Sequence, residues 1–428
     1  MSKFAMFKKT IADKTRKVER LALLPLLGVL AMPAQAVDLT WSGFGTVGFA
    51  QSDQSYKYQR FIDDRGTFKR DTILGGQLDA RLSPQWSATI QAKLAPSDHS
   101  DSAWQASLAW AFVSWRPSDD WLLRAGKIRL PLMLNTENHD VGATFDFARL
   151  PQEVYSISPL TDLVGLGVSK TWFGESMDWI AEAYAGKIET NWRYYGREMT
   201  PPPGPPGSWF FTYNVKSAGL VLTARSLDHT FRIGAHRVAV TRDGAKIGQP
   251  IVKNSFGIYQ FGSGGDDKLI IPLFTAGASI QLPADIRLIG EYAWIKVDSS
   301  TSEGLDRWGA YLSLSKRIGD WTPYVYYAKA KSRDSALNKY QSINGNVLSG
   351  PFAGLNPTQK FMADIIVPYD QWTVALGSSY RLTPSALLKA EWSQVNTGVA
   401  SSLVDAPSGG DSADKRINVF SLSYNFTF

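Results

Sequence analysis

The chain has 428 residues, of which 45 are lysine or arginine and 39 are aspartate or glutamate, giving a net charge of +6. It contains no cysteine, which excludes disulfides and thiol chemistry. The first 36 residues carry seven of the basic and two of the acidic residues, which leaves 38 against 37 and a net charge of +1. A chain so evenly charged, without a patch rich in lysine and arginine, does not predict nucleic acid as a partner.

Residues 1–36 have the three parts of a cleavable secretory signal. Seven lysines and arginines precede an apolar core of about a dozen residues, Leu21 to Met32. After the core, Ala34-Gln35-Ala36 supplies the small residues of a cleavage site. The core is too short to cross a membrane as a helix. We therefore predict a signal peptide over 1–36 and one mature domain over 37–428. An uncleaved helix lying in the membrane interface is the alternative.

Beyond residue 36 the dominant pattern is alternation between apolar and polar side chains in segments of about ten residues. In the segment 86–94, Trp86, Ile90 and Leu94 share one face, and Thr89 and Lys93 share the other. Successive side chains of a strand point to opposite faces of its sheet. The segments are therefore predicted to be strands that each have one apolar and one polar face.

The connections between these segments are alternately short and long. Seven short ones have the glycine, proline, serine and aspartate content of tight turns. They lie at 83–85, 116–120, 174–176, 226–228, 282–285, 319–320 and 383–385. Eight long ones lie at 51–69, 95–102, 129–162, 187–213, 242–268, 298–304, 331–368 and 397–413. Seven turns and eight loops join sixteen strands, which predicts an all-β fold: a transmembrane antiparallel barrel with short periplasmic turns and long extracellular loops.

Aromatic residues predict where the strands meet the membrane interfaces. Trp86, Trp121 and Tyr380 adjoin short turns, and Trp41 and Trp104 are expected nearer the long loops. Tryptophan and tyrosine gather at membrane interfaces and form girdles around such barrels. Cross-strand packing within a soluble sheet is the alternative.

The third long connection, residues 129–162, is unusually apolar for a loop. It contains Leu130-Pro131-Leu132-Met133-Leu134 and, later, Val154-Tyr155. A long apolar connection of this kind packs against another surface. The barrel interior, the barrel rim and a neighbouring subunit are the three surfaces open to it.

The last strand has the most regular alternation of the chain. Phe420, Leu422, Tyr424, Phe426 and Phe428 occupy every second position, with serine, asparagine and threonine between them. Strict alternation up to a terminal phenylalanine resembles the closing strand of Gram-negative outer-membrane barrels, where that end is the family's assembly signal. The resemblance implies that these five residues are recognised by the barrel-assembly machinery.

With sixteen strands and this ending, the mature chain resembles the Gram-negative outer-membrane porins, general or substrate-selective. The resemblance implies a place in the outer membrane of a Gram-negative bacterium, in contact with lipid and lipopolysaccharide, and no cofactor or metal. It also implies a water-filled channel for passive diffusion of small hydrophilic solutes and ions, because sixteen strands leave an aqueous interior. A monomer and a homotrimer both stay open.

Within that resemblance, the apolar loop occupies the place of the porin loop that folds into the lumen and narrows it. Its charged residues would then face the pore; they are Arg129, Glu137, Asp140, Asp146, Arg149 and Glu153. Alternation places a mainly basic set on the inner wall: Lys93, Arg124, Arg225, Arg232, Arg287, Glu291, Arg307, Arg317, Arg381 and Lys389. An excess of basic side chains favours anions, so we predict a mild anion preference. The alternative is that these charges only keep the wall hydrated.

Catalytic motifs are weak in this sequence. The histidines His99, His139, His229 and His236 do not have the spacing of a metal site, and no G-x-S-x-G motif occurs. The alternatives to a porin are an outer-membrane enzyme of the lipase type and a non-conducting adhesion or scaffold barrel.

Overall fold

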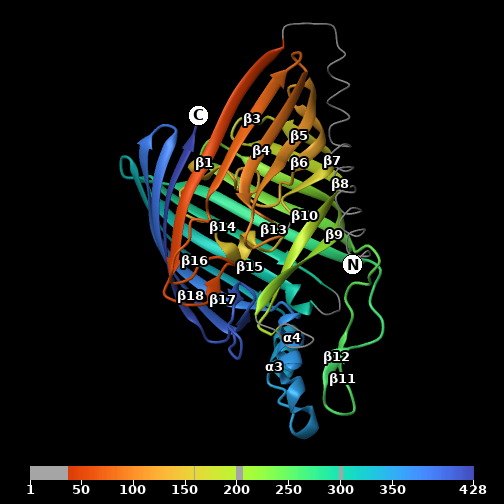
Figure 1. The fold of residues 1–428 in the computed structure, drawn as a ribbon. Helices are drawn as coiled ribbons and strands as arrows, with labels where there is room; N and C mark the ends of the chain where they lie inside the picture. The colour runs from red at the N-terminus through yellow and green to blue at the C-terminus, as the bar shows by residue number, and fades with distance from the viewer. Residues whose placement is uncertain (1–36, 159, 199–205, 298–301) are drawn as a thin grey trace.

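A computed structural model describes residues 37–158, 160–198, 206–297 and 302–428. The predicted signal peptide, residues 1–36, lies outside the described residues. No helix in the described ranges is both long enough and apolar enough to span a membrane. The described chain is dominated by antiparallel strands (Figure 1).

Sixteen strands form one closed barrel, which confirms the predicted fold class. Each strand pairs with its neighbours in the chain, and β1 closes the barrel by pairing with β20, from Phe44 opposite Thr427 to Ser52 opposite Val419. The barrel strands are β1 (Asp38–Ser52), β3 (Ile73–Arg81), β4 (Trp86–Pro96), β5 (Trp104–Ser118), β6 (Trp121–Arg129), β7 (Asp162–Trp172), β8 (Asp178–Gly196), β9 (Gly207–Arg225), β10 (His229–Thr241), β13 (Leu269–Leu282), β14 (Ile286–Ile295), β15 (Arg307–Lys316), β16 (Trp321–Ser332), β17 (Tyr369–Thr383), β18 (Ala386–Ser401) and β20 (Arg416–Thr427).

All seven predicted tight turns join consecutive barrel strands, and the eight longer connections lie at the other end. One predicted loop is too long: within 187–213, β8 continues to Gly196 and β9 begins at Gly207. Residues 187–196 pair in register with 207–216, so the two strands extend the wall beyond the expected rim. Aromatic residues on both faces of this stretch hid the alternation. We call the two ends of the barrel the turn end and the loop end.

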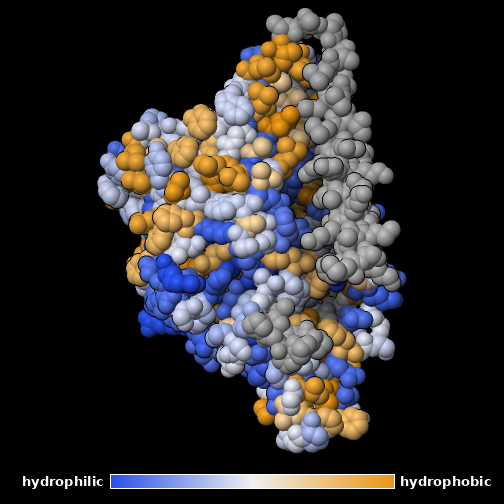
Figure 2. Space-filling view, viewed as in Figure 1, coloured by the Kyte–Doolittle hydropathy of each residue, from blue (hydrophilic) through white to orange (hydrophobic). Residues whose placement is uncertain are grey.

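The outer face of the wall is apolar, as the alternation predicts. Along β20, Phe420, Leu422 and Tyr424 are exposed, whereas Ser421 and Ser423 between them are buried inside the barrel. Figure 2 shows apolar side chains spread over the barrel strands on the face in view. A hydrocarbon solvent accepts such a surface, whereas water does not.

Trp41 corrects one detail of the predicted aromatic girdles. It pairs with Leu78, three residues from the turn after Arg81, and therefore lies at the turn end instead of near the long loops. The chain enters the barrel from the turn end, so the first residues of β1 belong there. Trp86 and Trp121 also lie at the turn end, and Trp104 lies at the loop end, as predicted.

The loop end carries the remaining elements. Helices α3 (Asp334–Asn344) and α4 (Asn356–Asp364) pack through Tyr340, Ile343 and Met362, and Figure 1 places them beside the small sheet of β11 (Ile251–Lys253) and β12 (Tyr259–Phe261). A second small sheet joins β2 (Lys57–Tyr58) to β19 (Val404–Asp405). Short helical turns complete the loops: η1 (Gly142–Thr144), α2 (Gln152–Tyr155), η2 (Glu303–Leu305) and η3 (Gly350–Leu355).

Candidate functional site: the loop inside the barrel

The loop between β6 and β7 folds into the barrel and packs on the inner wall. Its two ends are joined where the N–H of Leu130 donates to the carbonyl of Thr161 at 2.9 Å. Leu132, Met133 and Val154 are buried in one apolar cluster with inward residues of the wall. Of the three surfaces open to this loop, the structure therefore selects the barrel interior and not the rim.

Asp140 lies at the centre of an ion cluster on the β4 and β6 side. Its carboxylate accepts hydrogen bonds from Lys93 Nζ at 2.8 Å and from Arg129 Nη2 at 2.7 Å, and His139 Nε2 lies 3.2 Å away. Burial would raise the pKa of Asp140, but His139, Lys93 and Arg129 outweigh it and lower the pKa well below its usual value. Asp140 is 7% exposed, so it holds the loop to the wall.

The second half of the loop is fixed by buried polar contacts on other strands. Arg149 donates from Nε to Asp71 at 2.8 Å and reaches Ser421 of β20 at 3.3 Å. Glu153 is 2% exposed and accepts from Gln371 and Thr373 of β17, both at 2.6 Å. Buried carboxylates and guanidinium groups are tolerated when they are paired in this way.

Lys389 of β18 binds the middle of the loop. Its Nζ donates to the carbonyl oxygens of Gly142 at 2.6 Å and Phe147 at 2.8 Å, and it lies 4.1 Å from the centre of the Phe145 ring. Asp146 accepts from Ser379 of β17 at 2.5 Å. These backbone carbonyls inside the barrel accept hydrogen bonds from a charged side chain and not from water.

Strands β10, β14 and β15 hold both the beginning and the end of the loop. Glu291 accepts from the N–H of Leu134 and from the hydroxyl of Tyr155, both at 2.6 Å. Arg232 donates to the carbonyl of Met133 at 2.9 Å, and Arg307 donates to that of Ser156 at 2.6 Å. The loop is thus tied to both sides of the lumen.

Gly309 of β15 shows how closely loop and wall approach. A side chain at this position would collide with the carbonyl oxygen of Glu153, because the two backbones are in direct contact. Only glycine fits such an approach.

The predicted pore residues fall into two groups. Those that contact the loop or belong to it are Lys93, Arg124, Arg129, Glu137, Asp140, Asp146, Arg149, Glu153, Arg232, Glu291, Arg307 and Lys389. Among these the contact of Arg124 is the longest, with its Nη1 4.0 Å from Glu137, whose side chain is 44% exposed. Arg225, Arg287, Arg317 and Arg381 are exposed near the turn end, and no hydrogen bond or ion pair within the described chain joins them to the loop.

The expectation that these loop charges face the pore is wrong for Arg129 and Glu153, which are buried against the wall and line neither cavity. Asp140 and Arg149 are buried too, but both line the loop-end cavity. The wall offers hydrogen-bond partners at short range, and a buried charge is tolerated where it is paired with them.

Sequence reasoning missed an aromatic floor beneath the loop. The ring of Phe147 packs edge-on against Tyr311, Tyr324 and Tyr326, with centroid separations of 6.0, 5.2 and 5.8 Å. The hydroxyl of Tyr324 donates to Glu391 at 2.8 Å. Tyrosines occupy both faces of β16: Tyr324 and Tyr326 are buried inside, whereas Tyr327 is exposed outside. The sequence pattern alone therefore does not distinguish the inner from the outer tyrosines.

Two cavities lie on the β3 to β6 side of the lumen. One of about 380 Å³ is at the loop end, where Ala95 and Pro96 of β4 form part of its wall. The other, of about 690 Å³, is at the turn end and is lined by Ser87 and Thr89 of the same strand. Lys93, which holds Asp140, lies between these two levels of β4. The Asp140 cluster therefore borders the loop-end cavity, whose lining includes Asp140 and His139.

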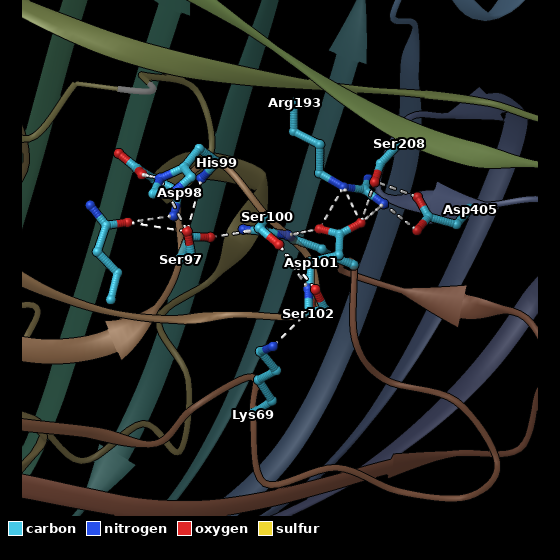
Figure 3. A network of polar contacts seen from close by, with 12 residues as sticks. Lys69, Ser97, Asp98, His99, Ser100, Asp101, Ser102, Arg193, Ser208 and Asp405 are labelled. Atoms are coloured by element: carbon cyan, nitrogen blue, oxygen red, sulfur yellow. Dashed lines mark hydrogen bonds and ion pairs between the residues drawn. The ribbon is translucent and has the colours of Figure 1, made fainter. Parts of the chain in front are cut away.

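The loops at the mouth are also joined by ion pairs (Figure 3). Asp101, between β4 and β5, accepts from Arg193 of β8 at 3.0 Å and from Ser208 of β9 at 2.6 Å. Arg193 also donates to Asp405 of β19 at 2.6 Å. Burial opposes these contacts, but the Arg193 and Ser208 bonds lower the pKa of Asp101 to about 2. The mouth therefore keeps a defined shape at neutral pH.

Similarity to known proteins appears in structure and not in sequence. No protein-family model matches the chain, and no curated protein is similar to it in sequence. Among solved structures, OmpT of Vibrio cholerae in its trimer form aligns with a TM-score of 0.51 at 11% identity, over 92% of this chain and 100% of that one. The outer membrane channel DcaP of Acinetobacter baumannii gives 0.51 at 12%, over 92% and 99%.

A third structure extends the same result. An anion-selective porin from Comamonas acidovorans aligns with a TM-score of 0.51 at 10% identity, over 92% of this chain and 100% of that one. The chain has the fold of Gram-negative outer-membrane porins. At such low identity the likeness establishes the fold, and the chemistry of the lumen must be argued from the residues of this chain.

Chemically, the described lumen offers charged and hydrogen-bonding groups but no metal centre. No group of three or more histidine, aspartate or glutamate side chains in the described ranges is placed to hold a metal ion. What the arrangement can do is exclude large solutes, hydrate small ones and distinguish them by charge.

Proposed function

We propose that this chain is an outer-membrane porin that lets small hydrophilic solutes and ions diffuse across the membrane, with a mild preference for anions. The single observation that carries this proposal is the loop of residues 130–161 folded inside a closed sixteen-stranded barrel, with a cavity on either side of it. A barrel of this size is too wide for its own wall side chains to fill.

The constriction is proposed to lie at the Asp140 cluster. Lys93 and Arg129 hold Asp140 against the stretch of β4 from Gln91 to Lys93, which lines neither of the two cavities. The opposite side of the lumen is filled by the apolar part of the loop and the tyrosines beneath it. Solutes would therefore pass along β1 and β3 to β6, beside this cluster.

The anion preference rests on the charges of that path. The turn-end cavity is lined by Arg81, Arg116 and Arg124 against two acids, Asp38 and Asp79. Asp79 is already hydrogen-bonded by neutral side chains, Gln77 at 2.7 Å and Thr89 at 2.6 Å. An excess of unpaired basic groups raises the local concentration of anions.

The proposal includes the export route and the environment. Residues 1–36 would direct secretion and be removed, and Phe420 to Phe428 would be recognised by the barrel-assembly machinery. The exposed apolar outer face supports insertion among outer-membrane lipid and lipopolysaccharide. The trimer form of one structural neighbour makes a homotrimer the assembly to test first, by cross-linking in the outer membrane.

Planar-bilayer recording of the purified protein tests the proposal. A porin gives stepwise, stable conductance, and a salt gradient across the bilayer gives a reversal potential displaced toward that of chloride. An adhesion or scaffold barrel inserts without conductance. A lipase-type enzyme would hydrolyse added phospholipid, whereas the proposal expects no such release.

A further inference from the structure

The inner wall of β3 to β6 at the turn end contains a hollow bordered by arginines. In one row across these strands, Arg81 pairs with Ser87, Ser87 with Ser114, and Ser114 with Arg124. Paired residues in neighbouring strands point to the same face, so two small serines lie between two arginines. All four side chains line the cavity of about 690 Å³.

The arginines of this hollow lack partners. Arg81 and Arg116 make no side-chain hydrogen bond or ion pair with any other residue for which positions are described, and Arg124 has only Glu137 at 4.0 Å. The buried Nε of Arg124 and Nε1 of Trp110 likewise have no acceptor within the described part of the chain. Donors thus outnumber acceptors on this part of the wall.

Aromatic rings form the loop-side border of the hollow. Phe112 stands in the next row, opposite Gly126 of β6, and Trp110 stands one row further on. The guanidinium of Arg124 lies 5.2 Å from the centre of the Phe112 ring. Gly126 has a φ of +133°, which other residues rarely adopt, and a side chain there would collide with the backbone of β5. At Gly126 the wall beside Phe112 therefore carries no side chain.

We propose that this hollow is a binding subsite for a small organic anion that carries a carboxylate on a flat apolar ring. The carboxylate would be bound by Arg116 and Arg124, which can each supply two parallel N–H donors. The ring would lie over Ser114 and against Phe112 and Trp110. The subsite rests on the proposed function, since solutes reach it through the channel, and it specifies a class of solute for that channel.

Benzoate is the probe that tests the subsite in planar bilayers. Added to the turn side, it should reduce the wild-type current in a saturable way, whereas neutral benzyl alcohol at the same concentrations should not. The double variant R116Q/R124Q should raise the half-blocking concentration about tenfold or more, because the carboxylate loses its charged hydrogen-bond donors. W110L should weaken the block by benzoate but leave the effect of inorganic phosphate unchanged.

The matched control is R287Q/R381Q, which also removes two positive charges, from β14 and β17 across the barrel. It should leave the half-blocking concentration of benzoate within about twofold of wild type. An equal loss in R287Q/R381Q and R116Q/R124Q, or a block by phosphate as strong as that by benzoate, would overturn the proposal. Calorimetric titration of benzoate into the detergent-folded barrel distinguishes failure of the subsite from failure of the proposed porin function. Benzoate binding to a barrel that carries no current would reject the porin function, and current through a barrel that does not bind benzoate would reject the subsite.

Discussion

Charged residues point inward on both sides of the lumen, but they have different roles on the two sides. On β14 to β18, inward charges such as Glu291, Glu391 and Lys389 are buried, and each is bonded to the loop or to a tyrosine. On β3 to β6, Arg81 and Arg116 border a cavity without partners among the residues with described positions. An inward charge is therefore structural where the loop covers it and available to solutes where the loop does not.

The seam between β20 and β1 joins these two sides, and its loss should have the largest effect. The N–H of Gly43 donates to the carbonyl of Phe428 at 2.9 Å, and the N–H of Phe428 donates back at 3.0 Å. Deleting Phe428 removes both bonds and the terminal aromatic ring. We expect most of the folded, heat-modifiable barrel to be lost from the outer membrane. F428W should restore it, and an unchanged yield in the deletion would refute the assembly role of the last strand.

Shortening the loop between Asn135 and Phe147 should give the next largest effect. It removes the Asp140 cluster and uncovers the tyrosines of the opposite wall, so the lumen widens on both sides. Single-channel conductance should rise severalfold. A matched deletion in the loop around Gly264 and Gly265, which lies between β12 and β13 at the loop end, should leave conductance near the wild-type value.

Replacing Lys389 by methionine tests the covered side alone. The carbonyls of Gly142 and Phe147 would lose their charged donor, at a cost of about 1–3 kcal/mol for each buried acceptor left unpaired. The loop should then detach intermittently, and the current should show brief openings above the wild-type level. R381M removes an inward charge that no loop residue contacts, so its current should show no more brief openings than the wild-type current.

Neutralising Asp140 should give the smallest effect, a change in ion preference. D140N leaves Lys93 and Arg129 without their shared anion, so the reversal potential in a salt gradient should shift toward that of chloride by a few millivolts. E137Q, which changes a half-exposed carboxylate, should shift it less. A shift of equal size in both variants would mean that Asp140 is not at the narrowest point.

The pH dependence of this cluster has a definite sign. Because the pKa of Asp140 is lowered in the folded barrel, its contribution is complete above the unfolded value of about 3.9 and is lost only as pH falls further. Loss of the Asp140 contacts should therefore add to the current noise only below about pH 4. The D140N channel should not show this acid transition.

Much of the fold followed from local patterns. Alternation in β20 and the turns around Pro84 and Pro384 are local features that predict the strands in which they lie or which they join. A period of two is enough to predict which face of a strand is apolar. The loop was predicted to be buried because Leu130 to Leu134 needed a surface. Which surface, and which partner each charge finds, depends on strands hundreds of residues away, such as Gln371 for Glu153. A single sequence does not encode those distances in any local pattern.

The chain's lack of cysteine allows a direct test of the central claim, that solutes pass on the β3 to β6 side of the lumen. Ala95 of β4 lines the loop-end cavity, and Ala375 of β17 is fully buried beneath the loop. Single-channel current through the A95C and A375C variants would be recorded before and after a negatively charged methanethiosulfonate. We predict a stepwise, lasting loss of current in A95C and none in A375C. Loss in A375C with none in A95C would place the path on the other side.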